Sequence, residues 1–134
     1  MRIISKYCQL IFTAGIFLFF GYSPANANPL KIESIAPNEA SVLFAQKKAV
    51  IVDVREDNEW DQQRIPGAIH IPLAQLNDRL AELKQYKNSP VITQCRSGGR
   101  SAQALEVLKT AGFTKVYNMD GGIRAWNKVG LATE

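Results

Sequence analysis

Cysteine and histidine are scarce in this chain of 134 residues, which contains two cysteines and one histidine. The nitrogen and sulfur ligands that most protein metal sites use are therefore nearly absent, and no cluster with metal-ligand spacing occurs. The basic residues form no run and are not interleaved with aromatic residues, as they are in many nucleic-acid binders. We expect no metal, no other cofactor and no nucleic-acid partner.

Long hydrophobic runs are also absent, apart from one near the N-terminus. Arg2 and Lys6 precede an apolar stretch over residues 8–20, and Ala25-Asn26-Ala27 follows it as a small-residue cleavage site. The stretch is short for a transmembrane helix, which needs about 20 apolar residues. We predict a cleavable signal peptide over residues 1–27 and an exported protein in the periplasm or an equivalent lumenal or extracellular compartment. An uncleaved anchor is the alternative.

Removal of the signal peptide would leave one domain over residues 28–134, a common size for a single domain. The loss of Arg2 and Lys6 leaves 14 basic residues against 12 acidic ones, a net charge of about +2 in place of +4. Cys8 also leaves, so Cys95 becomes the only thiol and no internal disulfide is possible in an oxidising compartment. A lone exported cysteine is either an inert thiol or a functional one.

Strand-like and helix-like segments alternate along residues 28–134. Short apolar or β-branched runs predict strands over residues 30–35, 49–54, 68–71, 91–94 and 115–118. Helices are predicted from Pro37 to about Gln46, up to Gln63, from Leu73 to Gln85 and from Arg100 to Ala111. This alternation predicts an α/β fold with an open, largely parallel sheet and helices on both faces.

A cysteine follows the strand predicted over residues 91–94 and opens a short basic loop. Cys95 is followed by Arg96, Ser97, Gly98, Gly99 and Arg100, where the next helix is predicted to begin. Backbone amides in such a turn form an anion-binding concavity, and the helix adds the positive end of its dipole. Both effects lower the pKa of a thiol, so the sequence predicts that Cys95 is reactive at neutral pH.

Three motifs in this order resemble the rhodanese (sulfurtransferase) family, specifically its single-domain exported members. The N-terminal signature is matched by Asp53-Val54-Arg55-Glu56, Glu59-Trp60 and Ile65-Pro66-Gly67-Ala68-Ile69-His70-Ile71-Pro72, the active loop by residues 95–100, and the C-terminal signature by Gly121-Gly122-Ile123-Arg124-Ala125-Trp126. Gln63-Arg64 departs from the Gly-His that the family often has. The resemblance implies a three-layer α/β/α sandwich around a five-stranded, mainly parallel sheet.

The resemblance also implies a thiosulfate sulfurtransferase. The Cys95 thiolate would take a sulfane sulfur from thiosulfate or a similar donor, become a persulfide, and pass the sulfur to a thiophilic acceptor such as cyanide or a thiol. Arg96 and Arg100 would attract the anionic donor. The amides from Arg96 to Arg100 would hold the outer sulfur as an oxyanion hole holds oxygen. We expect a monomer with no stable membrane association after processing.

Charged residues outside the loop are assigned supporting roles. Asp53 and Arg55 are two positions apart at a strand end and so project from one side, where we expect an ion pair that braces the loops around the site. Glu59 is interpreted in the same way. His70 lies within a short strand and is expected to be a hydrogen-bonded structural residue rather than a general base.

Two other functions are alternatives to sulfur transfer on this fold. A phosphatase or arsenate reductase on this fold would use a Cys-x5-Arg loop, whereas Arg100 comes one position early and the short loop suits a sulfur atom better than a tetrahedral oxyanion. A non-catalytic rhodanese-like interaction or sensing module typically loses the cysteine or the basic loop residues, and this chain keeps both.

The signal-peptide hypothesis predicts the N-terminus of the exported protein. Cleavage after Ala27 should give a chain that begins at Asn28, because the small residues before that bond fit the cleavage site of a signal peptidase. N-terminal sequencing of the exported form checks this. A membrane-extracted form that begins at Met1 would favour the uncleaved anchor instead.

Overall fold

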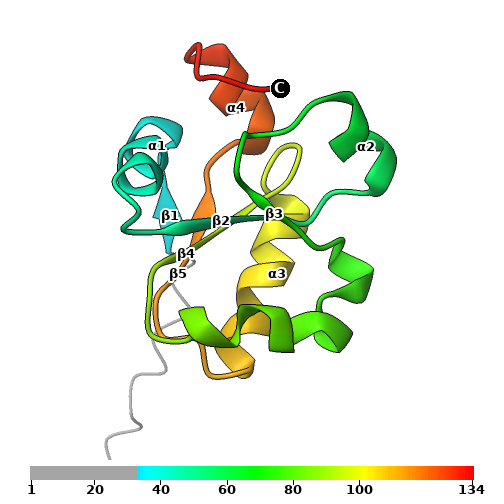
Figure 1. The fold of residues 1–134 in the computed structure, drawn as a ribbon. Coiled ribbons are helices and arrows are strands. Elements are labelled where there is room, and N and C mark those ends of the chain that lie inside the picture. Colours follow the sequence, from blue (N-terminus) through cyan, green and yellow to red (C-terminus); the bar gives the residue numbers. More distant parts are fainter. Residues whose placement is uncertain (1–32) are drawn as a thin grey trace, which may run out of the picture.

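The computed structural model describes residues 33–134, so the predicted signal peptide and Cys8 lie outside the described residues. Within that range, five parallel strands form one sheet in the order β1-β5-β4-β2-β3. The strands are β1 (Ser34–Ile35), β2 (Val50–Asp53), β3 (Ile69–His70), β4 (Val91–Gln94) and β5 (Val116–Met119). Helices cover both faces of the sheet (Figure 1), which confirms the α/β/α sandwich.

Residues 33–134 contain four α-helices, of which the first three match helices predicted from the sequence. They are α1 (Pro37–Ala45), α2 (Asp57–Gln62), α3 (Gly99–Thr110) and α4 (Gly122–Lys128). Proline suits the first position of α1, because its ring presets the helical φ and its missing N–H would have no partner in the first turn. Within the part of the chain that the structure describes, no helix is long and apolar enough to cross a membrane.

The segment after Pro72 differs from the sequence prediction. Two 3₁₀ helices, η1 (Leu73–Gln75) and η2 (Asn77–Tyr86), replace the single amphipathic helix predicted over residues 73–85. Backbone hydrogen bonds span three residues here, as from the amide of Leu76 to the carbonyl of Leu73. Residues three apart line up in a 3₁₀ helix, so the leucine spacing is compatible with this tighter winding. Leu76 and Leu83 are fully buried against the sheet.

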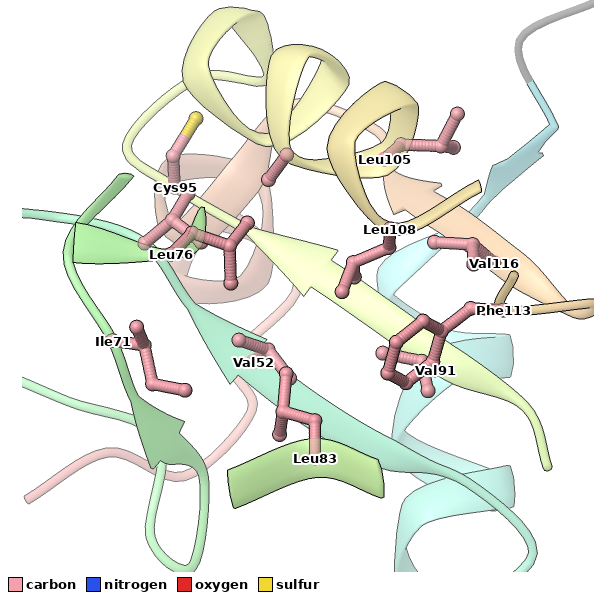
Figure 2. Close-up of a cluster of buried hydrophobic side chains, with 12 residues drawn as sticks. Val52, Ile71, Leu76, Leu83, Val91, Cys95, Leu105, Leu108, Phe113 and Val116 are labelled. Atoms are coloured by element: carbon pink, nitrogen blue, oxygen red, sulfur yellow. The ribbon is translucent and has the colours of Figure 1, made fainter. Parts of the chain in front are cut away.

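Two hydrophobic clusters pack on opposite faces of the sheet, because side chains alternate along a strand. On one face, Val52 and Val91 pack with residues of α3 and η2 (Figure 2). On the other face, their neighbours Ile51 and Ile92 pack with residues of α1 and α4. All four side chains are fully buried. The central strands are therefore apolar on both sides, as parallel strands covered by two helical layers require.

Parallel pairing brings the carboxyl ends of the strands to one edge of the sheet, where ligands bind in open α/β folds. β4 lies between β2 and β5, with Asp53 opposite Gln94 and Thr93 opposite Asn118. Cys95 follows β4 directly and therefore lies near the middle of this edge. The segments that follow β2 and β5 are its neighbours on either side.

Candidate active site

Cys95 begins a loop that folds back over its own sulfur atom. Gly98 adopts a φ of +113°, a left-handed conformation that glycine tolerates, and it is the residue before α3 begins. The turn directs the backbone amide of Gly98 to the Sγ atom of Cys95, at a distance of 3.1 Å. Cys95 is 1% exposed. Its sulfur therefore lies in a backbone cradle, at the edge of the cluster drawn in Figure 2.

The cradle lowers the pKa of the Cys95 thiol. Burial is the largest single influence and raises the pKa, but several hydrogen bonds together outweigh it. They come from the Ser101 side chain and from the backbone amides of Ser101, Gly98 and Ser97. The net result favours the thiolate, which is the nucleophilic form. This direction agrees with the prediction made from the loop sequence.

Ser101 and Asn118 form a polar pair behind the sulfur. Ser101 Oγ lies 3.3 Å from Cys95 Sγ and 2.6 Å from Asn118 Oδ1. The Asn118 side-chain amide donates to the carbonyl of Gly98 at 3.1 Å, so Oδ1 is the atom that faces Ser101. Ser101 has one hydroxyl proton to donate. Three acceptors lie within its reach, namely the Cys95 sulfur, Oδ1 of Asn118 and the carbonyl of Gly98 at 3.1 Å, so the hydroxyl is placed to donate to a thiolate.

Arg100 is held by Glu59 of α2. Its guanidinium donates to the two carboxylate oxygens at 2.6 and 2.9 Å. The same carboxylate accepts the backbone amide of Glu56 at 3.1 Å and so completes a capping box at the start of α2. The hydrogen bonding from Arg100 lowers the pKa of Glu59 to about 2. Arg100, assigned to anion capture from the sequence, thus ties the loop to α2 and has its charge balanced.

Asp53 and Arg55 form a buried ion pair at the end of β2. Nη2 of Arg55 lies 2.7 Å from Oδ2 of Asp53, and its Nε lies 3.0 Å from each carboxylate oxygen. Arg55 also donates to the carbonyls of Glu59 and Gln63, at 3.3 and 2.7 Å. The pair therefore fixes α2 to the sheet, and through Glu59 it acts on the position of Arg100.

His70 supports the segment after β2. Its Nε2 atom lies 2.8 Å from the carbonyl oxygen of Arg55, and its ring stacks on Trp60 with centroids 4.6 Å apart. These contacts give His70 the structural role that the sequence analysis expects. Over residues 33–134, no group of three or more histidine, cysteine, aspartate or glutamate side chains is placed to hold a metal ion.

The cysteine loop packs directly on the backbone of Gly122, the first residue of α4. A Cβ atom on Gly122 would lie 2.6 Å from the carbonyl carbon of Arg96 and would also overlap the carbonyl oxygen of Cys95. The next two amides, of Ile123 and Arg124, donate to the carbonyls of Cys95 and Arg96 at 2.8 and 3.2 Å. Any side chain at position 122 would therefore push the loop away from α4.

The other loop residues lie on the outer side of the cradle. Arg96, Ser97 and Gly99 are exposed. A Cβ atom on Gly99 would meet no neighbour within 4 Å, so the steric requirement for glycine falls on Gly98 and not on Gly99. Of the residues around the sulfur, sequence reasoning missed Asn118. The available signal was its place as the last residue of the strand predicted over residues 115–118, at the carboxyl edge of the sheet where ligands bind.

A family model described as Rhodanese-like domain matches residues 36–129. The chain belongs to the rhodanese-like family. A sulfurtransferase of Allochromatium vinosum is 35% identical over 104 residues, which cover 78% of this chain and 92% of that protein. The thiosulfate sulfurtransferase PspE of Escherichia coli is 39% identical over 70 residues, which cover 52% of this chain and 67% of that protein.

Solved structures share the rhodanese-like fold. The crystal structure of a rhodanese-related protein from Thermoplasma volcanium matches with a TM-score of 0.69 and 27% identity, over 76% of this chain and 97% of that chain. The chain spans about half the length of several other curated relatives that it matches, between 40% and 62%. Family and fold are therefore what this chain shares with these proteins.

Replacement of Glu59 should destabilise the fold in a pH-dependent way. The carboxyl has an ordinary pKa of 4.5 and a folded-state pKa of about 2, so its ion pair stabilises the fold above the ordinary value and loses that contribution as the pH falls toward 2. Because the pair is partly exposed, we expect Glu59→Gln to cost about 1 kcal/mol at neutral pH and less at about pH 3. Urea unfolding at both pH values measures this.

Glu82→Gln is the matched control, because Glu82 pairs with Arg79 in an exposed ion pair on η2. Its replacement should change the free energy of unfolding less than Glu59→Gln does. A loss in Glu59→Gln that is the same at both pH values, or no larger than in the control, would contradict the role assigned to Glu59.

Replacement of Ser101 should raise the pKa of the Cys95 thiol. Ser101→Ala removes a donor to the thiolate and leaves the Gly98 amide in place, so the pH midpoint for alkylation of Cys95 by iodoacetamide should rise. Ser97→Ala, which removes an exposed hydroxyl from the same loop, should leave the midpoint unchanged. A midpoint in Ser101→Ala at or below that of the unmodified chain would show that Ser101 does not stabilise the thiolate.

Proposed function

We propose that this protein is a sulfurtransferase that carries a sulfane sulfur on Cys95 as a persulfide, with thiosulfate or a similar anion as the donor. The observation that carries the proposal is the cradle in which the Gly98 amide lies 3.1 Å from the sulfur of Cys95. The rhodanese-like family and the similarity to sulfurtransferases of A. vinosum and E. coli support a sulfurtransferase-type reaction.

The first half of the proposed reaction needs no proton donor. The Cys95 thiolate attacks the outer sulfur of thiosulfate, a new S–S bond forms, and the original S–S bond breaks so that sulfite leaves with the bonding electron pair. The negative charge passes to the outer sulfur of the persulfide. Backbone donors such as the Gly98 amide stabilise charge at that place, as in an oxyanion hole.

The second half transfers the sulfur to a nucleophile. Cyanide or a thiolate attacks the outer sulfur, and Cys95 departs as a thiolate. Groups of lower pKa leave faster in thiol–disulfide chemistry, so the hydrogen bonds that lower the pKa of Cys95 assist this step as well. Arg96, exposed and adjacent to Cys95, supplies positive potential for anionic reactants.

The ion pair between Arg100 and Glu59 supports sulfur transfer over phosphate chemistry. A Cys-x5-Arg phosphatase needs the arginine to bind the substrate oxyanion, and here Nη1 and Nη2 of Arg100 both donate to the Glu59 carboxylate.

We also propose that the protein is exported, on the strength of the sequence over residues 1–27.

Mass spectrometry of the protein after incubation with thiosulfate tests the proposal. The peptide that contains Cys95 should gain the mass of one sulfur atom and lose it when cyanide is added, with thiocyanate formed. Cys95→Ala should lower thiocyanate formation by at least about a thousandfold without unfolding the protein, because the covalent intermediate is lost. Cys8→Ala is the control and should keep the activity. Thiocyanate formed at the normal rate by folded Cys95→Ala would overturn the mechanism.

A further inference from the structure

A pocket of about 240 Å³ lies beside the cysteine loop. Its walls come from the end of α2, from the loop residue Arg96 and from α4, which contributes Arg124 and Asn127. None of the α2 or α4 residues in these walls takes part in the reaction described above. The volume is somewhat below the range of about 300 to 1,000 Å³ that is usual for drug-sized ligands, so the pocket suits a small metabolite.

Two positively charged side chains line the pocket without an ion-pair partner in the part of the chain that the structure describes. Its other charged lining residues are Arg55 and Glu59, and each is paired, with Asp53 and with Arg100 respectively. The guanidinium groups of Arg96 and Arg124 form no hydrogen bond or ion pair with any residue between 33 and 134. Two unpaired guanidinium groups on one small pocket attract an anion, and a carboxylate matches their geometry.

A fixed amide pair closes one side of this pocket. The side-chain amide nitrogen of Asn127 donates to Oε1 of Gln63 at 2.9 Å, and that of Gln63 donates to Oδ1 of Asn127 at 3.3 Å. Gln63 also donates to Oγ1 of Thr133 at 2.9 Å. These bonds join the end of α2 to α4 across the pocket. The wall is therefore polar and uncharged, and it is held in place independently of any ligand.

The pocket and the reactive sulfur share the backbone of one loop. Arg96 follows Cys95 directly, and the amide of Arg124 donates to the carbonyl of Arg96 at 3.2 Å. A ligand whose anionic end lies between Arg96 and Arg124 is thus next to the cysteine loop. Thiosulfate carries its charge and its transferable sulfur on neighbouring atoms and has no need of a second anion site. A molecule in which a carbon chain separates the charge from the sulfur can place its anionic end in the pocket and its sulfur at Cys95.

We propose that this pocket binds the carboxylate of a small thiol that accepts the sulfur from Cys95, a proposal that rests on the proposed function. The thiolate of the acceptor attacks the outer sulfur of the Cys95 persulfide, a new S–S bond forms, and the persulfide S–S bond breaks. Cys95 leaves as a thiolate with the bonding pair, and the acceptor becomes a carboxylated persulfide. No oxidant or reductant is consumed.

A pair of acceptors of equal chain length tests the proposal. We would measure sulfite release from saturating thiosulfate with 3-mercaptopropionate and with 3-mercapto-1-propanol, which differ in the carboxylate. The unmodified protein should prefer the carboxylated thiol, mainly through a lower KM. Arg124→Gln should lower the ratio of the two kcat/KM values about fivefold, because one of two partly exposed cationic contacts is lost.

Lys128→Gln is the matched control, since Lys128 is an exposed cation on the same helix and does not line the pocket. It should leave the ratio unchanged, and Arg124→Lys should retain part of the preference. An equal fall of the ratio in Lys128→Gln and Arg124→Gln, or no preference in the unmodified protein, would overturn the pocket proposal. If thiocyanate still formed from cyanide in that case, the proposed function would stand. No turnover with any acceptor would overturn the proposed function itself.

Discussion

The close approach between the backbone of Gly122 and the loop after Cys95 is the constraint on which the site depends. The carbonyls of Cys95 and Arg96 accept hydrogen bonds from the amides of Ile123 and Arg124 in α4, and a Cβ atom on Gly122 would not fit between the two segments. Both carbonyls thus face α4. The loop then turns at Gly98, and the Gly98 amide faces the sulfur of Cys95. Structural support and the electrostatics of the thiolate therefore come from one backbone arrangement.

The charges around this loop are divided between two tasks. Asp53 with Arg55 and Glu59 with Arg100 form ion pairs that fix α2 against the sheet and the loop against α2. Arg96 and Arg124 form no such pair with any residue between 33 and 134, and both line the pocket beside the cysteine loop. Basic residues in the motifs thus do not act alike. The partners in the fold decide which cations hold the protein together and which stay available to bind an anion.

The sequence was sufficient for the architecture because the information is local. The β-branched runs of β2 and β4, apolar on both faces, indicated a covered parallel sheet, and Cys95 at the end of one run indicated the site. The polar contacts around the site were harder to predict from the sequence, since Glu59 and Arg100 are 41 positions apart and Ser101 and Asn118 are 17 apart. Only the folded sheet brings them together. The 3₁₀ winding after Pro72 was missed because leucines three and four apart fit an α-helix equally well.

We infer that the folded loop, and not the cysteine alone, makes the sulfur reactive. A spectroscopic titration of the thiolate in the Cys8→Ser chain, in which Cys95 is the only thiol, tests it most directly when done on the folded and on the urea-unfolded protein. We expect a lower thiol pKa in the folded protein, because the hydrogen bonds from Gly98 and Ser101 outweigh the effect of burial. An equal or higher pKa in the folded protein would contradict it.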